Sequence, residues 1–336
     1  MISEKKTYQT SYGLLRILAC CLVIIHHFDA IVSDASNQKV IALIDNLTMI
    51  NNGLFFMLSG KFALEHFQGS ILSYYYNRFV KIILPYLIIN CILNFAQGYT
   101  FGEYISRLRS GEIYNWFVYA VAGFYLVAPF LHFMFHDMSE KYKLLFLLGL
   151  LLYTAMNFVE GSFGNVFYIA SNQFFGTISF FFLGYLVDNV KILKKHKWSL
   201  IGAGIISACV SSYEAAFMPE FNPNLYGLCL TRICMCISVY VLVCWYEPAR
   251  VYSEKYQKCV KYMAGLTYYV YLFHVVIQDR FAVWHSYRIC KNPYVRLGIG
   301  SLEVAVLAFV FAFIYRTAEK TVVVCIHFIG EKIFNT

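Results

Sequence analysis

Long apolar stretches recur along the whole of this 336-residue sequence. A helix of about 20 apolar residues crosses a hydrocarbon core of ~30 Å. Stretches of that kind centre on 12–32, 45–66, 79–98, 115–135, 144–158, 168–187, 198–218, 229–247, 262–281 and 297–316. They predict an all-α, polytopic integral membrane protein with about ten transmembrane helices in one bundle. The second stretch begins with polar residues, which favours a break at that point.

The composition agrees with a membrane protein. Hydrophobic residues make up 60% of the chain and charged residues only 14%, whereas soluble domains carry about 25% charged residues. The net charge of +8 fits the excess of lysine and arginine that orients membrane proteins, so it does not require a nucleic acid. Most basic residues outside the apolar stretches lie on the side of the N-terminus, which predicts both termini in the cytoplasm. The expected partners include membrane lipids and no nucleic acid.

No change of composition divides the chain, so we expect one domain over residues 1–336. Residues 320–336 are apolar but too short to cross, and they are expected to form a tail at the membrane interface. The first apolar stretch lacks a signal-peptide cleavage site and is expected to remain as a span. Most of the 11 cysteines fall within apolar stretches and are interpreted as small apolar side chains; no metal site is predicted.

Arg16 and His27 lie in one almost wholly apolar run, LLRILACCLVIIHHF. Ionisable groups are costly in hydrocarbon and are functional candidates there. At about 100° per residue, their spacing returns both side chains to one helix face, about 16 Å apart along the axis. One helix would then hold a cation near a membrane surface and a titratable base near mid-depth. The alternatives are that Arg16 extends to the surface and that a histidine such as His26 makes only an interhelical hydrogen bond.

The segment GLFFMLSGKF brings further polar residues into apolar surroundings. Ser59 and Gly60 fit a small-residue surface on which another helix packs closely. Lys61, which follows directly, is harder to explain by packing alone.

The segment YYYNRFVKIILPY places Arg78 and Lys81 three residues apart, on one helix face at the predicted cytoplasmic surface. They are interpreted either as anchors that orient the chain or as a clamp for phosphate groups. Weaker candidates are His274 in YYVYLFH and Trp116 and Tyr125 in WFVYAVAGFYLVAP. The alternative for His274 is a structural, hydrogen-bonded histidine.

Taken in order, these motifs resemble the acyltransferase-3 family of integral membrane acyltransferases, which includes bacterial O-acetyltransferases that modify lipopolysaccharide, capsule or exopolysaccharide. RILACCLVIIHH resembles the family's first-span motif, in which ten residues separate an arginine and a histidine. GLFFMLSGKF resembles its FF-x-x-SG motif. RFVKIILPY is similar to its R-x-x-R segment followed by proline, with Lys81 where arginine is common. Three further segments resemble later motifs of the family, namely NWFVYAVAGFYLVAPFL, FFFLGYLV and LTYYVYLFH.

The resemblance implies a multi-pass enzyme of the plasma (inner) membrane that moves an acetyl or other short acyl group from cytoplasmic acyl-CoA to a hydroxyl group. The acceptor would be a cell-envelope or extracellular polysaccharide, or a lipid-linked oligosaccharide. Acetyl-CoA would be a co-substrate, with no permanently bound cofactor. Arg78, Lys81 and Arg16 would hold the donor phosphates. His27 would be the general base or, as an alternative, a transient acyl carrier, so that His27 and Arg16 are the catalytic candidates. The further substrate- or CoA-binding candidates are Ser59, Lys61, Trp116, Tyr125 and His274.

Two other classes of protein fit the same residues. Buried arginine, histidine, lysine and glutamate side chains also suit a transporter or flippase that moves a lipid-linked sugar or a small solute. Such a protein is expected to carry an inverted internal repeat with paired broken helices, and no such repeat is evident in the sequence. A membrane sensor without chemistry would normally carry a soluble output domain, for which no loop has room.

Overall fold

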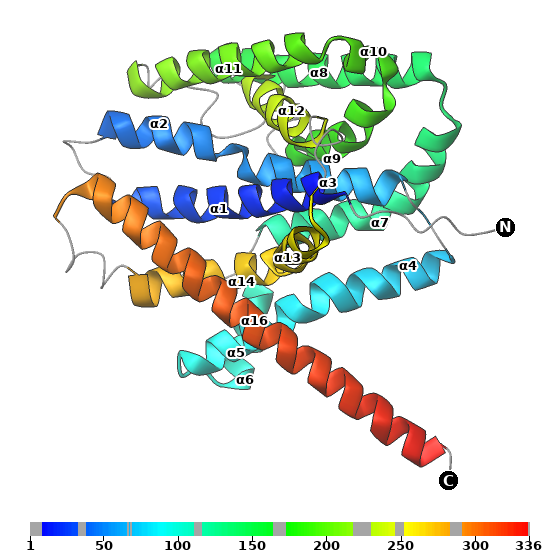
Figure 1. Ribbon diagram of the computed structural model, residues 1–336, viewed down its shortest axis with the longest axis vertical. Helices are drawn as coiled ribbons and strands as arrows, with labels where there is room; N and C mark the ends of the chain where they lie inside the picture. Colours follow the sequence, from blue (N-terminus) through cyan, green and yellow to red (C-terminus); the bar gives the residue numbers. More distant parts are fainter. Residues whose placement is uncertain are drawn as a thin grey trace.

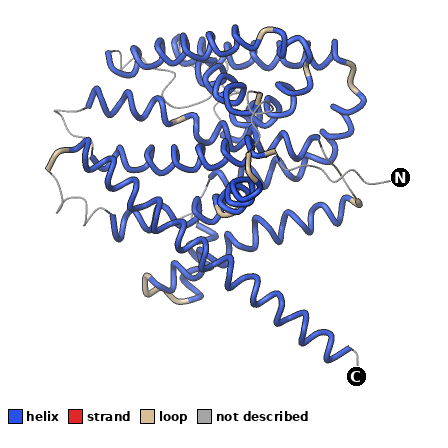
Figure 2. The backbone as a smooth tube through the Cα atoms, viewed as in Figure 1, coloured by secondary structure: helices blue, strands red, loops and turns tan. Residues whose placement is uncertain are grey.

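The computed structural model describes residues 9–32, 38–65, 67, 69–110, 116–163, 173–217, 230–245, 252–282 and 291–334. All regular structure in these ranges is helical, as the sequence predicts (Figure 2). The helices are α1 (Thr10–Val32), α2 (Gln38–Thr48), α3 (Ile50–Glu65), α4 (Ile71–Arg78), η1 (Phe79–Ile83), α5 (Leu84–Ala96), α6 (Phe101–Ser110), α7 (Trp116–Asp137), α8 (Glu140–Phe163), α9 (Gln173–Asn189), α10 (Lys191–Lys195), α11 (Lys197–Phe217), α12 (Leu230–Cys244), α13 (Glu254–Ala264), α14 (Thr267–Ile277), η4 (Gln278–Ala282) and α16 (Pro293–Phe334).

Several helices are long and apolar enough to cross a membrane. In the described ranges they are Thr10–Phe28, Gln38–Glu65, Ile71–Ala96, Trp116–Asp137, Lys197–Phe217 and Pro293–Thr321. The pair α13 and α14, which meet at a 52° bend, makes a seventh if it is one span. The protein is therefore a multi-pass membrane protein. The predicted count of ten spans is not confirmed, and the side on which the termini lie remains a prediction.

Helix α1 lies in the interior of the bundle. Figure 1 shows it beside α3, with α11 and α8 on one side of this pair and α14, α16 and α5 on the other. It contacts α2, α3, α12, α13, α14 and α16. Its apolar side chains Leu15, Ala19, Val23, Ile24 and Phe28 are fully or almost fully buried. This packing fixes the helix that carries Arg16 and His27.

The second predicted stretch is interrupted at its polar start. Helix α2 ends at Thr48 and α3 begins at Ile50, with a single turn residue between them. Two neighbouring helices bond to this break: Arg232 of α12 donates Nη1–H to the carbonyl oxygen of Asn46 (2.5 Å), and the Asn46 amide donates to Ser211 Oγ of α11 (3.0 Å). In hydrocarbon, such partners are needed where a helix leaves backbone groups unpaired.

Helices α3 and α9 cross in contact through two glycines. A Cβ on Gly60 would lie 1.7 Å from the carbonyl oxygen of Phe181, and a Cβ on Gly184 would lie 1.7 Å from that of Met57. Small residues permit such close backbone approach in membrane helices. The packing interpretation of the Ser59–Gly60 pair is thus confirmed for Gly60.

We expect Gly184→Ala to destabilise the protein strongly, because the added methyl group meets backbone that cannot rotate away. Overpacking costs about 1–3 kcal/mol, and the effect here should lie at the upper end. The measurement is heat unfolding of the detergent-solubilised protein, followed by size-exclusion chromatography. Gly202→Ala in α11 is the matched control, since nothing lies within 4 Å of its Cβ position. Equal melting temperatures for the two variants would contradict this account of the crossing.

The third span contains a π-helical segment, η1, that the sequence analysis does not predict. It ends at Ile83, two residues before Pro85, whose nitrogen has no hydrogen to donate to the carbonyl oxygen of Lys81. Local π geometry commonly accommodates such interruptions and is frequent at functional sites. The turn between Arg78 and Lys81 is therefore π-helical in part, and both side chains still face one cavity, which is described below.

Helix α16 is longer than predicted. It runs unbroken for 42 residues, a length of about 63 Å, and its C-terminal half extends away from the bundle (Figure 1). We expected a span that ends at residue 316 and a separate tail that begins at residue 320. This prediction of a break is wrong, because the helix continues through both positions. The position of the tail at the membrane interface remains a prediction.

Candidate active site

A cavity of about 420 Å³ lies between α1, α3, η1, α7, α14 and α16. Its basic lining residues are Arg16, Arg78, Lys81 and Arg316, and no aspartate or glutamate among the described residues lines it. Aromatic side chains form much of the remaining wall, namely Phe55, Phe117, Tyr125, Tyr268, Tyr269 and Tyr271. The volume falls within the range of about 300–1,000 Å³ that is usual for small-molecule sites.

Aromatic rings support the arginine side chains of this cavity. The Arg78 guanidinium lies 4.3 Å from the ring centre of Tyr125 and 5.0 Å from that of Tyr74. The Arg16 guanidinium lies 5.6 Å from the ring centre of Phe62. Such cation–π contacts stabilise a guanidinium while leaving its N–H groups able to bind an anion.

Arg316 enters the same cavity from α16. Its Nη1 donates to the carbonyl oxygen of Tyr262 (3.4 Å), and the guanidinium lies 5.2 Å from the Tyr262 ring centre. The turn between α13 and α14 makes room for it at Gly265, where a Cβ would lie 2.7 Å from Nη1. Arg316 could not be predicted as a site residue, because a basic residue at the end of an apolar stretch is indistinguishable in sequence from an orienting anchor.

Several cations around one cavity, without a lining carboxylate among the described residues, attract a ligand with several negative charges. Arginine suits phosphate because its planar fork presents paired donors. The aromatic wall offers an apolar surface to the uncharged part of such a ligand. The site thus has the chemistry of a pocket for an amphipathic, phosphate-bearing molecule.

His27 lies farther along α1 than this cavity, and its side chain is exposed. Its ring centre is 5.0 Å from that of His274 and 5.4 Å from that of His26. Gln278 donates its side-chain N–H to the carbonyl oxygen of His27 (2.7 Å). His26 turns toward α2, where its Nδ1 lies 2.6 Å from Asp45 Oδ1. His26 thus makes an interhelical contact with an acidic side chain, and His27 faces a different neighbour.

An aromatic wall joins the cavity to the histidines. Tyr271 lines the cavity, and its ring centre lies 4.8 Å from that of Phe117 and 5.4 Å from that of His274. His274 in turn contacts His27. This wall thus lies between a ligand anchored by the basic residues and the His27 side.

Of the candidates chosen from sequence, the structure brings Arg16, Ser59, Arg78, Lys81 and Tyr125 together around the cavity. His27 and His274 lie together beyond its aromatic wall. The other two candidates, Trp116 and Lys61, lie elsewhere. Trp116 packs on Phe56, with ring centres 6.0 Å apart, and is not among the residues that line the cavity.

Lys61 does not line the cavity either, because it belongs to a buried ion pair. Its Nζ lies 2.6 Å from Asp188 Oδ2 and 3.0 Å from Glu65 Oε1. Asp188 also accepts hydrogen bonds from Tyr12, Tyr240 and Trp245, at 2.9, 2.7 and 2.9 Å. Asp188 was not predicted as a functional residue. The signal that could have indicated it is its position as an acidic residue at the end of the apolar run FFFLGYLVD.

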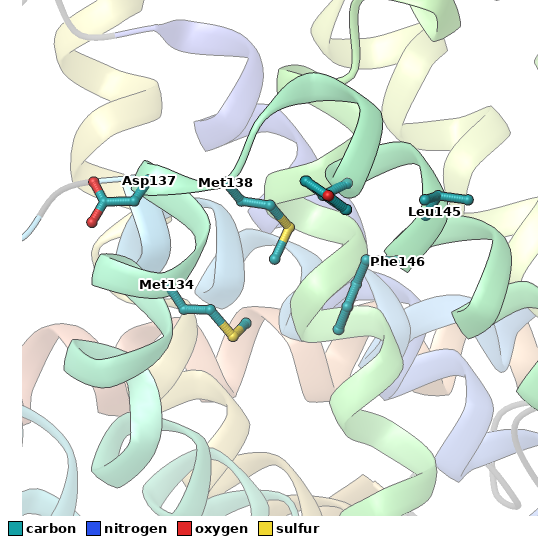
Figure 3. A pocket seen from close by; sticks show the side chains of 6 residues that line it. Met134, Asp137, Met138, Leu145 and Phe146 are labelled. Carbon is teal, nitrogen blue, oxygen red and sulfur yellow. The ribbon is translucent and has the colours of Figure 1, made fainter.

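A second hollow, of about 580 Å³, lies on the surface where α7 turns into α8. Its lining residues are Met134, Asp137, Met138, Tyr142, Leu145 and Phe146, and the Asp137 carboxylate points away from Met134 and Met138 (Figure 3). It has none of the basic side chains of the first cavity. Among the described residues no group of three or more histidine, cysteine or acidic side chains is placed to hold a metal ion.

The comparison with protein families agrees with this arrangement. The model of the acyltransferase-3 family, described as an acyltransferase domain, matches residues 10–316. The chain therefore belongs to the acyltransferase-3 family and is a membrane acyltransferase. No curated protein and no solved structure matches it significantly.

Proposed function

We propose that the protein transfers an acetyl or other short acyl group from cytoplasmic acyl-CoA to a hydroxyl group of a cell-envelope or extracellular polysaccharide. The acceptor includes the lipid-linked precursor of such a glycan, and the membrane is the plasma (inner) membrane. No permanently bound cofactor takes part, since acetyl-CoA enters and leaves as a co-substrate.

The observation that carries this proposal is the cavity with Arg16, Arg78, Lys81 and Arg316 in its wall. CoA carries a diphosphate and a third phosphate group at one end and a thioester at the other. The basic residues suit its phosphates, and the aromatic wall suits its uncharged arm. Because the wall leads to His274 and His27, a donor held in this way directs its thioester toward His27.

In the proposed reaction His27 acts as a general base. The acceptor hydroxyl oxygen attacks the thioester carbonyl carbon while a ring nitrogen of His27 takes the hydroxyl proton. The carbon–sulfur bond then breaks, and the CoA thiolate leaves and takes up that proton. The products are the acylated glycan and free CoA. The exposed side chain of His27 is consistent with an acceptor that approaches from the far side of the aromatic wall.

The test is isotope transfer in proteoliposomes that contain the purified protein. Acetyl-CoA with a labelled acetyl group is supplied on one side, with a polysaccharide or lipid-linked oligosaccharide acceptor, and free CoA and labelled glycan are measured. We expect equal amounts of both products. Movement of the sugar lipid across the bilayer without label transfer would refute the proposal and establish the transporter alternative.

We expect Arg78→Ala to raise the Kd for acetyl-CoA by roughly 10–100-fold, because it removes a charge-assisted contact with phosphate. Binding to the detergent-solubilised protein is measured by isothermal titration calorimetry. Arg109→Ala is the control, since Arg109 lies on α6, is exposed and does not line the cavity. The same Kd in wild type and Arg78→Ala would mean that the donor does not bind in this cavity.

A further inference from the structure

The hydrogen bond made by His274 determines which of its ring nitrogens carries hydrogen. Nδ1 lies 2.6 Å from the carbonyl oxygen of Tyr271, one turn back in α14. A carbonyl oxygen only accepts, so Nδ1 must be the donor, and in the neutral ring Nε2 is left with a lone pair. His274 is 1% exposed, and its Nε2 is buried with no hydrogen-bond partner among the described residues.

The nearest imidazole to this unfilled acceptor is that of His27. The two ring centres are 5.0 Å apart, and the ring planes are inclined by 48°. Catalytic hydrogen bonds are often long in unliganded enzymes and tighten when the substrates bind. The other neighbour of His27, His26, is held by Asp45 on α2. Of the two imidazoles that contact His27, His274 is therefore the one with an unfilled hydrogen-bond acceptor.

The backbone supports the same pairing. The Cys20 thiol lies 3.8 Å from the Thr267 carbonyl oxygen, and seven residues farther along both helices His27 meets His274. Helices α1 and α14 therefore run parallel and in register. Gln278, four residues after His274 and on the same face, bonds to the His27 carbonyl oxygen. One face of α14 and its π-helical continuation thus contacts both the ring and the main chain of His27.

We propose that His274 is a positioning residue whose Nε2 accepts a hydrogen bond from a ring N–H of His27. That bond fixes the His27 tautomer, so that the other ring nitrogen is free to take the proton of the acceptor hydroxyl. His27 then carries both hydrogens until the CoA thiolate takes one, and His274 keeps its own hydrogen throughout. The inference rests on the proposed role of His27 as the base.

The test compares His274→Gln with His274→Asn. A glutamine amide reaches about as far as Nε2 and retains an acceptor there, whereas an asparagine amide ends near the position of Nδ1. We expect kcat for acyl transfer to fall about 10²-fold in the asparagine variant, and much less in the glutamine variant, with KM for acetyl-CoA unchanged in both. Phe273→Leu is the control for packing of α14, because Phe273 contacts Phe311 of α16 instead of His27.

Equal kcat values for the glutamine and asparagine variants, or a rise in KM alone, would overturn the positioning role. His27→Ala is measured beside them: full activity in that variant would refute the proposed base itself, which is a separate failure. If the variants do not fold, a ¹⁵N–¹⁵N scalar coupling between the His27 and His274 rings is sought in wild-type protein with acetyl-CoA and acceptor bound. Its presence supports the hydrogen bond, and its absence in the loaded protein refutes it.

Discussion

We expect His27→Ala to lower the rate of acyl transfer by at least about 10²–10⁴-fold, the usual contribution of a general base. Without the imidazole, the acceptor hydroxyl loses the group that takes its proton. Binding of acetyl-CoA should be unchanged, because Arg16 lies about 16 Å away along the same helix. The measurement is labelled-glycan formation in proteoliposomes, together with calorimetric binding of acetyl-CoA to the same preparation.

His26→Gln is the matched control for this variant. It removes the adjacent imidazole, which turns to Asp45 of α2, and it should retain most of the wild-type rate. If His27→Ala kept the wild-type rate, or if the two variants lost activity equally, His27 would not be the specific base. A loss of acetyl-CoA binding in His27→Ala would instead indicate that the His27 ring helps to hold the donor.

A second large effect is expected from Asp188→Leu, which leaves Lys61 buried without its main counter-charge. The side chains of Lys61 and Asp188 are only 7% and 10% exposed. Breaking a buried ion pair by removing one partner costs about 3–5 kcal/mol. The hydroxyl groups of Tyr12 and Tyr240 would lose their acceptor as well. Heat unfolding in detergent should therefore occur at a much lower temperature than in wild type.

The double variant Lys61→Met with Asp188→Leu separates the charge from the hydrogen bonds. Replacing both partners of a buried pair by apolar side chains is often nearly neutral, so the double variant should be clearly more stable than Asp188→Leu. Its remaining loss would reflect the donors on Tyr12, Tyr240 and Trp245. Equal stability of the single and double variants would show that the uncompensated Lys61 charge is not the cause.

The helical spans could be predicted because hydropathy is a local property of sequence. The residues at which helices end were harder to predict from the sequence. Nothing in the composition of residues 316–320 ends a helix, so α16 continues where a separate tail was expected. The π-helical segment before Pro85 was also missed, because a proline within an apolar stretch is compatible with several backbone responses.

The candidate site was predictable to the extent that it depends on spacing within one helix. The separation of Arg16 and His27 follows from the helical repeat, and the pairing of Arg78 with Lys81 is also local. Which helices lie next to one another cannot be predicted from spacing within a single helix. Arg316 lines the cavity from a helix 300 residues beyond Arg16, and Lys61 was assigned to the substrate because its partner Asp188 lies far along the chain.

Arg16 and His27 share one continuous helix, and this sets the reach that a donor must have. Intrahelical hydrogen bonds keep the two positions about 16 Å apart along the axis. Any movement of α7 or α16 against α1 would leave this separation unchanged. For a donor bound by its phosphates at Arg16, the linker between phosphate and thioester is therefore selected by length. Molecules with the same anionic end and a shorter linker would occupy the cavity without reacting, and they would act as competitive inhibitors.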